Sequence, residues 1–196
     1  MTDPLEEDRL HTKPADMESM LEQVLSEVTA CVRQVPAESL NQAEMLMETA
    51  PRIFVAGAGR SGLCMRAFGM RLMHLGKTVY VVGETITPGI TAADLLILGS
   101  GSGRTTGLLG VAEMARRQGA KILLFTTDAA SPLAQLADHR IVIPAPSLRE
   151  AQGSLQPMGS LFEQSLLILC DSLILKLMQR GGVDAAQMLE RHANLE

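Results

Sequence analysis

Residues 52–62 of this chain read Arg-Ile-Phe-Val-Ala-Gly-Ala-Gly-Arg-Ser-Gly, an apolar run that passes directly into a glycine-rich turn. The run at 52–56 has the length and composition of a buried strand. Apolar residues at helical spacing follow from 61 to 75. Glycine at such a turn lets the backbone approach a ligand closely. This strand–turn–helix unit predicts an α/β fold, and its turn also matches the dinucleotide-binding pattern GxGxxG.

The same alternation of short apolar runs and helical segments continues on both sides of this unit. Further strands are predicted at 78–82, 95–98, 121–126 and 139–143, and further helices at 17–35, 37–49, 104–118 and 159–180, with a short helix before the tail 191–196. Strands that are apolar throughout and separated by helices are typical of a parallel sheet covered on both faces. We therefore predict one doubly wound α/β domain over 17–196, with a five-stranded parallel sheet flanked by helices. A flexible leader is predicted at 1–16.

The composition excludes several classes of protein. The 196 residues carry a net charge of −5 and only 3% aromatic residues, so neither a basic surface nor stacking platforms for nucleic acid are expected. Three cysteines without a CxxC pair fit a reducing compartment, and no zinc-ligand spacing is present. The polar N-terminus lacks a signal-peptide core, and the apolar stretch 166–177 is too short and too polar to cross a bilayer. We expect a cytoplasmic protein with no metal site and with neither nucleic acid nor membrane as a partner.

A second glycine-rich loop, Ser100-Gly101-Ser102-Gly103-Arg104-Thr105, follows the third predicted strand and opens another helix. Its three hydroxyl groups and the free N–H groups of a helix start are donors suited to a phosphate. Ser and Gly are also ordinary turn and cap residues, but two such loops at strand ends favour a shared anion site. A dinucleotide needs only one glycine loop, whereas the three terminal oxygens of a phosphate monoester need several donors. The P-loop pattern GxxxxGK[ST] does not occur.

Together with these loops, five stretches of the chain resemble the sugar isomerase (SIS) domain family, and within it the 6-phospho-3-hexuloisomerases. They are 59–62, 70–76, 82–88, 157–163 and 191–196. The resemblance implies conversion of D-arabino-hex-3-ulose 6-phosphate to D-fructose 6-phosphate through an enediol, a step of formaldehyde fixation in the ribulose monophosphate pathway. It also implies a homo-oligomer, with a tetramer as the expected size, and no cofactor.

The candidate catalytic residues are Glu163 and His192. Glu163 lies in the first turn of a long apolar helix, where the free N–H groups would keep a buried carboxylate charged; the same charge would also stabilise a helix without any catalytic role. A histidine side chain can both give and take a proton near neutral pH, and the resemblance implies that His192 reaches the site of a neighbouring subunit. The predicted phosphate and substrate ligands are Gly59, Arg60, Ser61, Ser100, Gly101, Ser102, Thr105 and Glu84.

Four side chains keep two interpretations each. Arg60 either neutralises the phosphate or forms a structural ion pair, and Glu84 either binds a substrate hydroxyl or lies at an interface. Many SIS domains carry Glu where Arg104 stands, so Arg104 is either a phosphate ligand or no part of the site. His74 either packs in the core or at an interface, which is the expected role, or takes part in catalysis.

Three other functions compete with this isomerase. A non-catalytic sugar-phosphate sensor would need an output module for which 196 residues leave little room. A nicotinamide-dependent oxidoreductase would need a substrate domain of its own. Another phosphosugar isomerase, such as one acting on arabinose 5-phosphate, differs from the favoured function in substrate alone.

Overall fold

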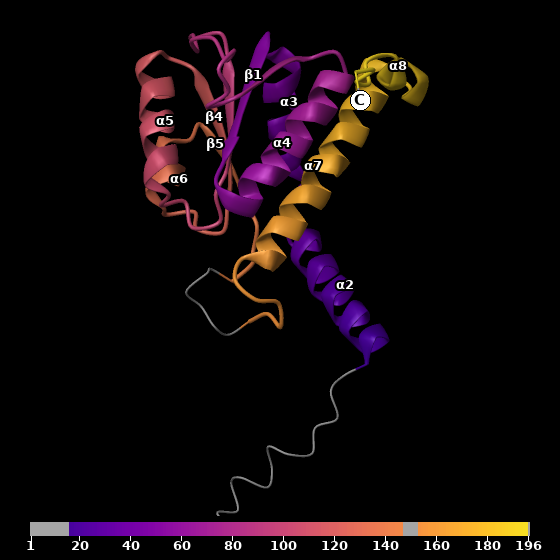
Figure 1. Ribbon diagram of the computed structural model, residues 1–196. Helices are drawn as coiled ribbons and strands as arrows, with labels where there is room; N and C mark the ends of the chain where they lie inside the picture. Colours follow the sequence, from indigo (N-terminus) through magenta and orange to yellow (C-terminus); the bar gives the residue numbers. More distant parts are fainter. Residues whose placement is uncertain (1–15, 147–152, 196) are drawn as a thin grey trace, which may run out of the picture.

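The computed structural model describes residues 16–146 and 153–195, which form a parallel sheet of five strands between two layers of helices (Figure 1). The strands pair in the order β2-β1-β3-β4-β5. Every pairing is parallel, with Val55 opposite Val81 on one side and opposite Ile97 on the other. The strands are β1 (Arg52–Gly57), β2 (Thr78–Val81), β3 (Leu95–Gly99), β4 (Lys121–Thr126) and β5 (His139–Val142). The five predicted strands and their parallel arrangement are confirmed.

Alternate side chains of each strand enter two separate cores, one on each face of the sheet. Ile53 and Val55 point toward the first core, and Phe54 and Ala56 toward the second. The first core is covered by α2 (Met17–Arg33), α3 (Ala37–Thr49), α4 (Gly59–His74) and α7 (Ser160–Gly181), and the second by α5 (Thr106–Arg117) and α6 (Pro132–Leu136). Because both faces are buried, the central strands carry apolar residues at every position rather than at alternate ones.

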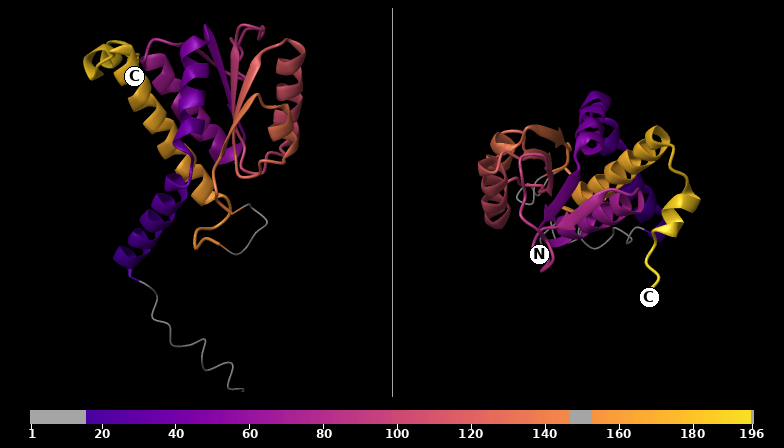
Figure 2. Two further views of the ribbon diagram at one scale, coloured as in Figure 1. Left: turned by 180° about the vertical axis from the view of Figure 1, so that it is seen from behind. Right: turned by 90° about the horizontal axis from the view of Figure 1, so that it is seen from above.

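Two helices have unusual positions in Figures 1 and 2. The N-terminal half of α2 extends away from the rest of the molecule, while its C-terminal half packs against α7 and buries Val28 and Cys31. The short helix α8 (Ala185–Glu190) follows Gly182, whose φ of 62° ends α7, and it lies at the far end of α7 from the sheet's loops.

The prediction differs from the structure in a few places. Helix α6 was not expected, because its five residues are too few to show helical periodicity. Helix α4 begins at Gly59 rather than Ser61, and α5 begins at Thr106 rather than Arg104. The predicted leader lies outside the described residues except for Asp16, which caps α2 by accepting a hydrogen bond from Ser19 N.

The described residues contain neither a membrane-spanning helix nor a cluster of metal-binding side chains. Among residues 16–146 and 153–195, no helix is long and apolar enough to span a membrane. In the same part of the chain, no group of three or more His, Cys, Asp or Glu side chains is placed to hold a metal ion.

Candidate active site

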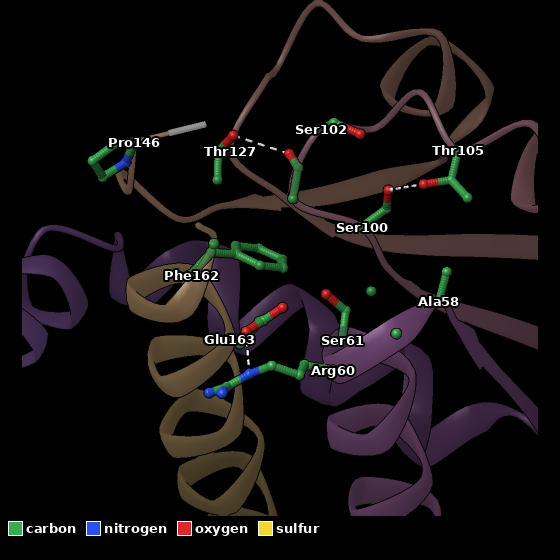
Figure 3. A pocket seen from close by; sticks show the side chains of 14 residues that line it. Ala58, Arg60, Ser61, Ser100, Ser102, Thr105, Thr127, Pro146, Phe162 and Glu163 are labelled. Atoms are coloured by element: carbon green, nitrogen blue, oxygen red, sulfur yellow. Dashed lines mark hydrogen bonds and ion pairs between the residues drawn. The ribbon is translucent and has the colours of Figure 1, made fainter. Parts of the chain in front are cut away.

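A pocket opens at the carboxyl ends of β1 and β3, where the direction of strand addition reverses (Figure 3). β1 leads into α4 on one face of the sheet and β3 leads toward α5 on the other, which leaves a crevice between the two loops. Its volume of about 280 Å³ is near the lower end of small-molecule sites, roughly 300–1,000 Å³. The lining residues are Ala58, Gly59, Arg60, Ser61, Gly99, Ser100, Gly101, Ser102, Thr105, Thr127, Pro146, Gly159, Phe162 and Glu163.

The first wall is the turn between β1 and the start of α4. A Cβ on Gly57 would lie 2.8 Å from the Cα of Gly62, so both residues must be glycine for the helix to start this close to the strand. Since α4 begins at Gly59, the N–H groups of residues 59–61 belong to its first turn and have no carbonyl one turn earlier to bond to. The side chain of Ser61 points into the pocket beside them (Figure 3). This wall therefore offers several N–H donors and one hydroxyl to an anion.

The second wall is the loop from Ser100 to Thr105. The hydroxyls of Ser100 and Thr105 lie 3.3 Å apart, and Ser102 Oγ accepts a hydrogen bond from Arg104 N at 3.3 Å. Gly103, with a φ of 60°, turns the loop back toward α5. The loop is held from the neighbouring strand, since Thr126 and Thr127 both donate to Gly101 O, at 3.0 and 2.9 Å. These hydrogen bonds fix the backbone of the loop that carries the hydroxyls of Ser100, Ser102 and Thr105.

A carboxylate enters the pocket from the third wall, the first turn of α7. Glu163 Oε2 lies 2.5 Å from Arg60 Nε, and the Glu163 side chain is 16% exposed while that of Arg60 is 62% exposed. Figure 3 shows this pair on the side of the pocket away from the hydroxyls of Ser100 and Thr105. The structure places Arg60 against the carboxylate, which corresponds to the ion-pair interpretation. The pocket accordingly has a hydroxyl-rich end for an anion and an acid–base end.

Glu84, a predicted ligand, and Arg104, whose role the sequence left open, do not line the pocket. Glu84 lies in the connection after β2 and pairs with Arg66 at 2.5 Å. Arg104 lies in the second loop, and its guanidinium pairs with Asp128 at 2.9 Å. A substrate-binding role for either stays a prediction.

His192 lies at the opposite end of the molecule from Glu163. It follows α8, and its ring stacks on His74 with 5.4 Å between ring centroids. Between α8 and Glu163 lies nearly the whole of α7, whose 22 residues span about 33 Å at 1.5 Å per residue. The burial of His74 lowers its pKa, and the nearby charges of Arg71 and His192 lower it further. His192 therefore cannot serve the pocket of its own chain in this arrangement.

Sequence reasoning did not assign six of the lining residues to the site: Ala58, Gly99, Thr127, Pro146, Gly159 and Phe162. Thr127 directly follows β4, the neighbour of β3, so the rule that ligands bind at the carboxyl ends of parallel strands would have found it. Phe162 gave no signal, because an apolar residue in an apolar helix is normally part of the core. Its ring would lie 3.2 Å from a Cβ on Gly101, which explains why the loop carries glycine at this point.

The fold and the pocket together define a known class of protein. The SIS domain model matches residues 46–169, more than half of the chain and nearly all of the sheet and pocket. This chain belongs to the SIS domain family.

Sequence relatives narrow the class further. A 3-hexulose-6-phosphate isomerase of Mycobacterium gastri is 44% identical over 183 residues, covering 92% of each chain. The 3-hexulose-6-phosphate isomerase of Bacillus subtilis is 40% identical over 89% of this chain and 96% of its own. A solved structure from Methanococcus jannaschii, for which that same isomerase function was inferred, superposes with a TM-score of 0.80 at 34% identity. It covers 91% of this chain and 99% of the other.

Proposed function

We propose that this chain is a 3-hexulose-6-phosphate isomerase, converting D-arabino-hex-3-ulose 6-phosphate to D-fructose 6-phosphate in the cytoplasm. The observation that carries the proposal is the pairing of a hydroxyl-rich anion site with the carboxylate of Glu163 in one pocket. The relatives of that name, 40–44% identical over about nine tenths of the chain, support the choice of substrate.

In this reaction the phosphate occupies the end of the pocket formed by the two loops. Ser61, Ser100 and Thr105 donate to its oxygens, together with Ser102 and the first N–H groups of α4. Among the residues that the structure describes, Arg60 and Glu163 are the only charged side chains that line the pocket. Neutral donors therefore supply most of the contacts to the phosphate. A substrate held by its phosphate presents its carbonyl end to Glu163.

The carboxylate of Glu163 carries one proton between two carbons. It takes the proton from C2 while the carbonyl oxygen at C3 is protonated, which gives the 2,3-enediol. It then returns the proton to C3 while the hydroxyl proton leaves O2, which produces the carbonyl at C2. Arg60, in contact with Glu163, stabilises a negative charge developing on the enediol oxygens. The step consumes no oxidant and releases no group.

The proton at the oxygens is assigned to His192 of a neighbouring subunit. His192 cannot reach Glu163 within one chain, and α2 exposes Met17, Leu21 and Leu25 on a helix that extends from the body. We therefore include a homo-oligomer, with a tetramer as the expected size, in the proposed function.

The direct test is turnover of a panel of ketose and aldose phosphates by the purified protein and by Glu163→Gln. A positioned base contributes about 10²–10⁴-fold, so kcat for the hexulose phosphate should fall by that factor with little change in KM. Glu113→Gln, an exposed carboxylate on α5, is the matched control and should behave as the wild type. Turnover of another phosphosugar in preference to the hexulose phosphate would replace the substrate, and an unaffected kcat in Glu163→Gln would remove the assigned base.

A subunit-mixing experiment tests the assignment of His192. Neither Glu163→Gln nor a protein lacking residues 191–196 should be active alone. Hybrid oligomers combine an intact Glu163 with an intact neighbouring tail, so activity should return after subunit exchange. Hybrids verified by mass spectrometry that stay inactive would contradict a shared site.

A further inference from the structure

A carboxylate outside the pocket, Glu27 of α2, binds the segment that leads into the catalytic helix. Glu27 Oε1 accepts the backbone N–H of Leu155 at 2.7 Å. Glu27 Oε2 accepts the hydroxyl of Ser154 at 2.7 Å and the side-chain amide of Gln156 at 3.1 Å. Ser154 Oγ in turn accepts the N–H of Gln156 at 3.0 Å, so one carboxylate organises three successive residues. We call residues 154–156 the clamped segment.

Apolar packing contributes little to holding this part of the chain. The side chains of Leu155 and Met158 are 73% and 76% exposed, although both are large and apolar. Hydrogen bonds to Glu27 therefore carry the restraint that burial supplies elsewhere in the molecule. The ionised state of the carboxylate fits this role: burial acts to raise the pKa of Glu27, but the hydrogen bonds from Leu155, Ser154 and Gln156 hold it below its ordinary value.

The chain between the clamped segment and the pocket is short and strained. Met158 has a φ of 61°, a left-handed conformation that a residue with a side chain adopts only where its surroundings impose it. The next residue, Gly159, lines the pocket, and Phe162 and Glu163 follow within the first turn of α7. Only three residues separate Gly159 from Glu163, so a displacement of the clamped segment moves the catalytic carboxylate.

Helix α2 is itself fixed against the helix it positions. Val28, the residue after Glu27, and Cys31, one turn beyond it, are buried where α2 packs on α7. Glu27 thus lies on a helix that packs against α7, and its carboxylate binds the segment that precedes α7 in the chain.

We propose that Glu27 is a positioning residue of the active site, which fixes the entry to α7 and thereby the place of the Glu163 carboxylate. The proposal rests on the proposed function for the role of Glu163, and the contact itself does not depend on the substrate. The two phosphate-binding loops belong to other elements, so Glu27 should affect the acid–base end of the pocket and leave the anion end intact.

The test compares Glu27→Ala, Glu27→Gln and the matched control Glu22→Ala, which removes an exposed carboxylate from the same helix. Alanine keeps the helix propensity of α2. Misplacement of a reacting group by about 1 Å can cost 10²-fold in rate, so kcat of Glu27→Ala should fall about 10- to 100-fold. Glu27→Gln retains an acceptor for Leu155 N–H and should lose less. KM and the inhibition constant of inorganic phosphate should stay within about twofold of the wild type, because both report the anion end.

Hydrogen–deuterium exchange of the full chain separates this inference from the proposed function. In Glu27→Ala the backbone amides of residues 155–163 should exchange faster than in the wild type and in Glu22→Ala, with no ligand present. Unchanged exchange there would overturn the inference whatever the protein acts on, as would faster exchange with an unchanged kcat. If the wild type is inactive on every phosphosugar while Glu27→Ala still exchanges faster than the wild type, the proposed function is overturned and the contact of Glu27 with residues 154–156 still stands.

Discussion

Gly103→Ala tests the backbone geometry of the loop from Ser100 to Thr105. A Cβ at this position would lie 2.0 Å from Ser131 Oγ and 2.4 Å from Ser131 Cβ, far inside normal contact. Ser131 is fully buried and caps α6 by accepting a hydrogen bond from Ala134 N. The φ of 60° costs an alanine roughly 1–2 kcal/mol, and an overpacked site costs a further 1–3 kcal/mol or so. We therefore expect Gly103→Ala to lower the free energy of unfolding by about 2–5 kcal/mol.

Urea denaturation followed by circular dichroism measures this loss. All variants are compared at one protein concentration, because association would make the apparent stability depend on it. Gly107→Ala is the matched control: a Cβ there meets nothing within 4 Å, and alanine in place of glycine in a helix should leave the stability unchanged or raise it by up to about 1 kcal/mol. Adding Ser131→Gly to Gly103→Ala removes the clashing atoms and should recover part of the loss. A Gly103→Ala protein as stable as the wild type would refute the reasoning.

Two further predictions concern ionisable groups. Hydrogen bonds from Arg52, against the effect of burial, hold the pKa of Asp94 below its ordinary value of 3.8, so Asp94 stabilises the fold above that pH and the contribution is lost as the pH falls through the lower, folded-state pKa. At pH 7, Asp94→Asn should therefore lower the free energy of unfolding in urea by at most about 3 kcal/mol, since Arg52 is partly exposed. The difference in unfolding free energy between variant and wild type should disappear below pH 3.8, and a difference that stays constant with pH would contradict this. Burial raises the pKa of the Cys64 thiol, and the negative charge of Glu163 raises it further. Glu163→Gln should therefore speed the alkylation of Cys64 by iodoacetamide at pH 8, while the buried Cys31 and Cys170 stay slow. An unchanged rate would mean that Glu163 and Cys64 do not interact.

The sheet was predictable because its signal is repeated and local. Apolar runs such as Leu95–Gly99 are buried at all five positions, and a run this short that ends in a glycine turn has the length of a strand rather than of a helix. The predicted starts of α4 and α5 each differ from the structure by two residues, because glycine and serine are common both in turns and in the first turn of a helix.

The pocket was predictable only where its residues follow a strand. Ser61 and Ser100 were found because parallel strands bring their carboxyl ends to one edge. The contact between Arg60 and Glu163 joins residues about a hundred positions apart on two helices, and the sequence alone left Arg60 open between two roles. The place of His192 on His74, far from Glu163, depends on how α8 folds back on α4, which no local pattern encodes.

The position of α7 in the chain bears on how the protein is synthesised. Nine of its residues are buried, and they complete the core on one face of the sheet, yet the ribosome makes α7 after all five strands. About 40 residues separate the end of β5 from the end of α7, an interval on the order of 2–8 s at about 5–20 residues per second. Until then the core that contains Val55, Ile97 and Leu123 lacks one of its four covering helices, so the nascent chain presents an open apolar surface to chaperones. A premature stop before residue 160 would make that surface permanent, and the product should aggregate or be degraded.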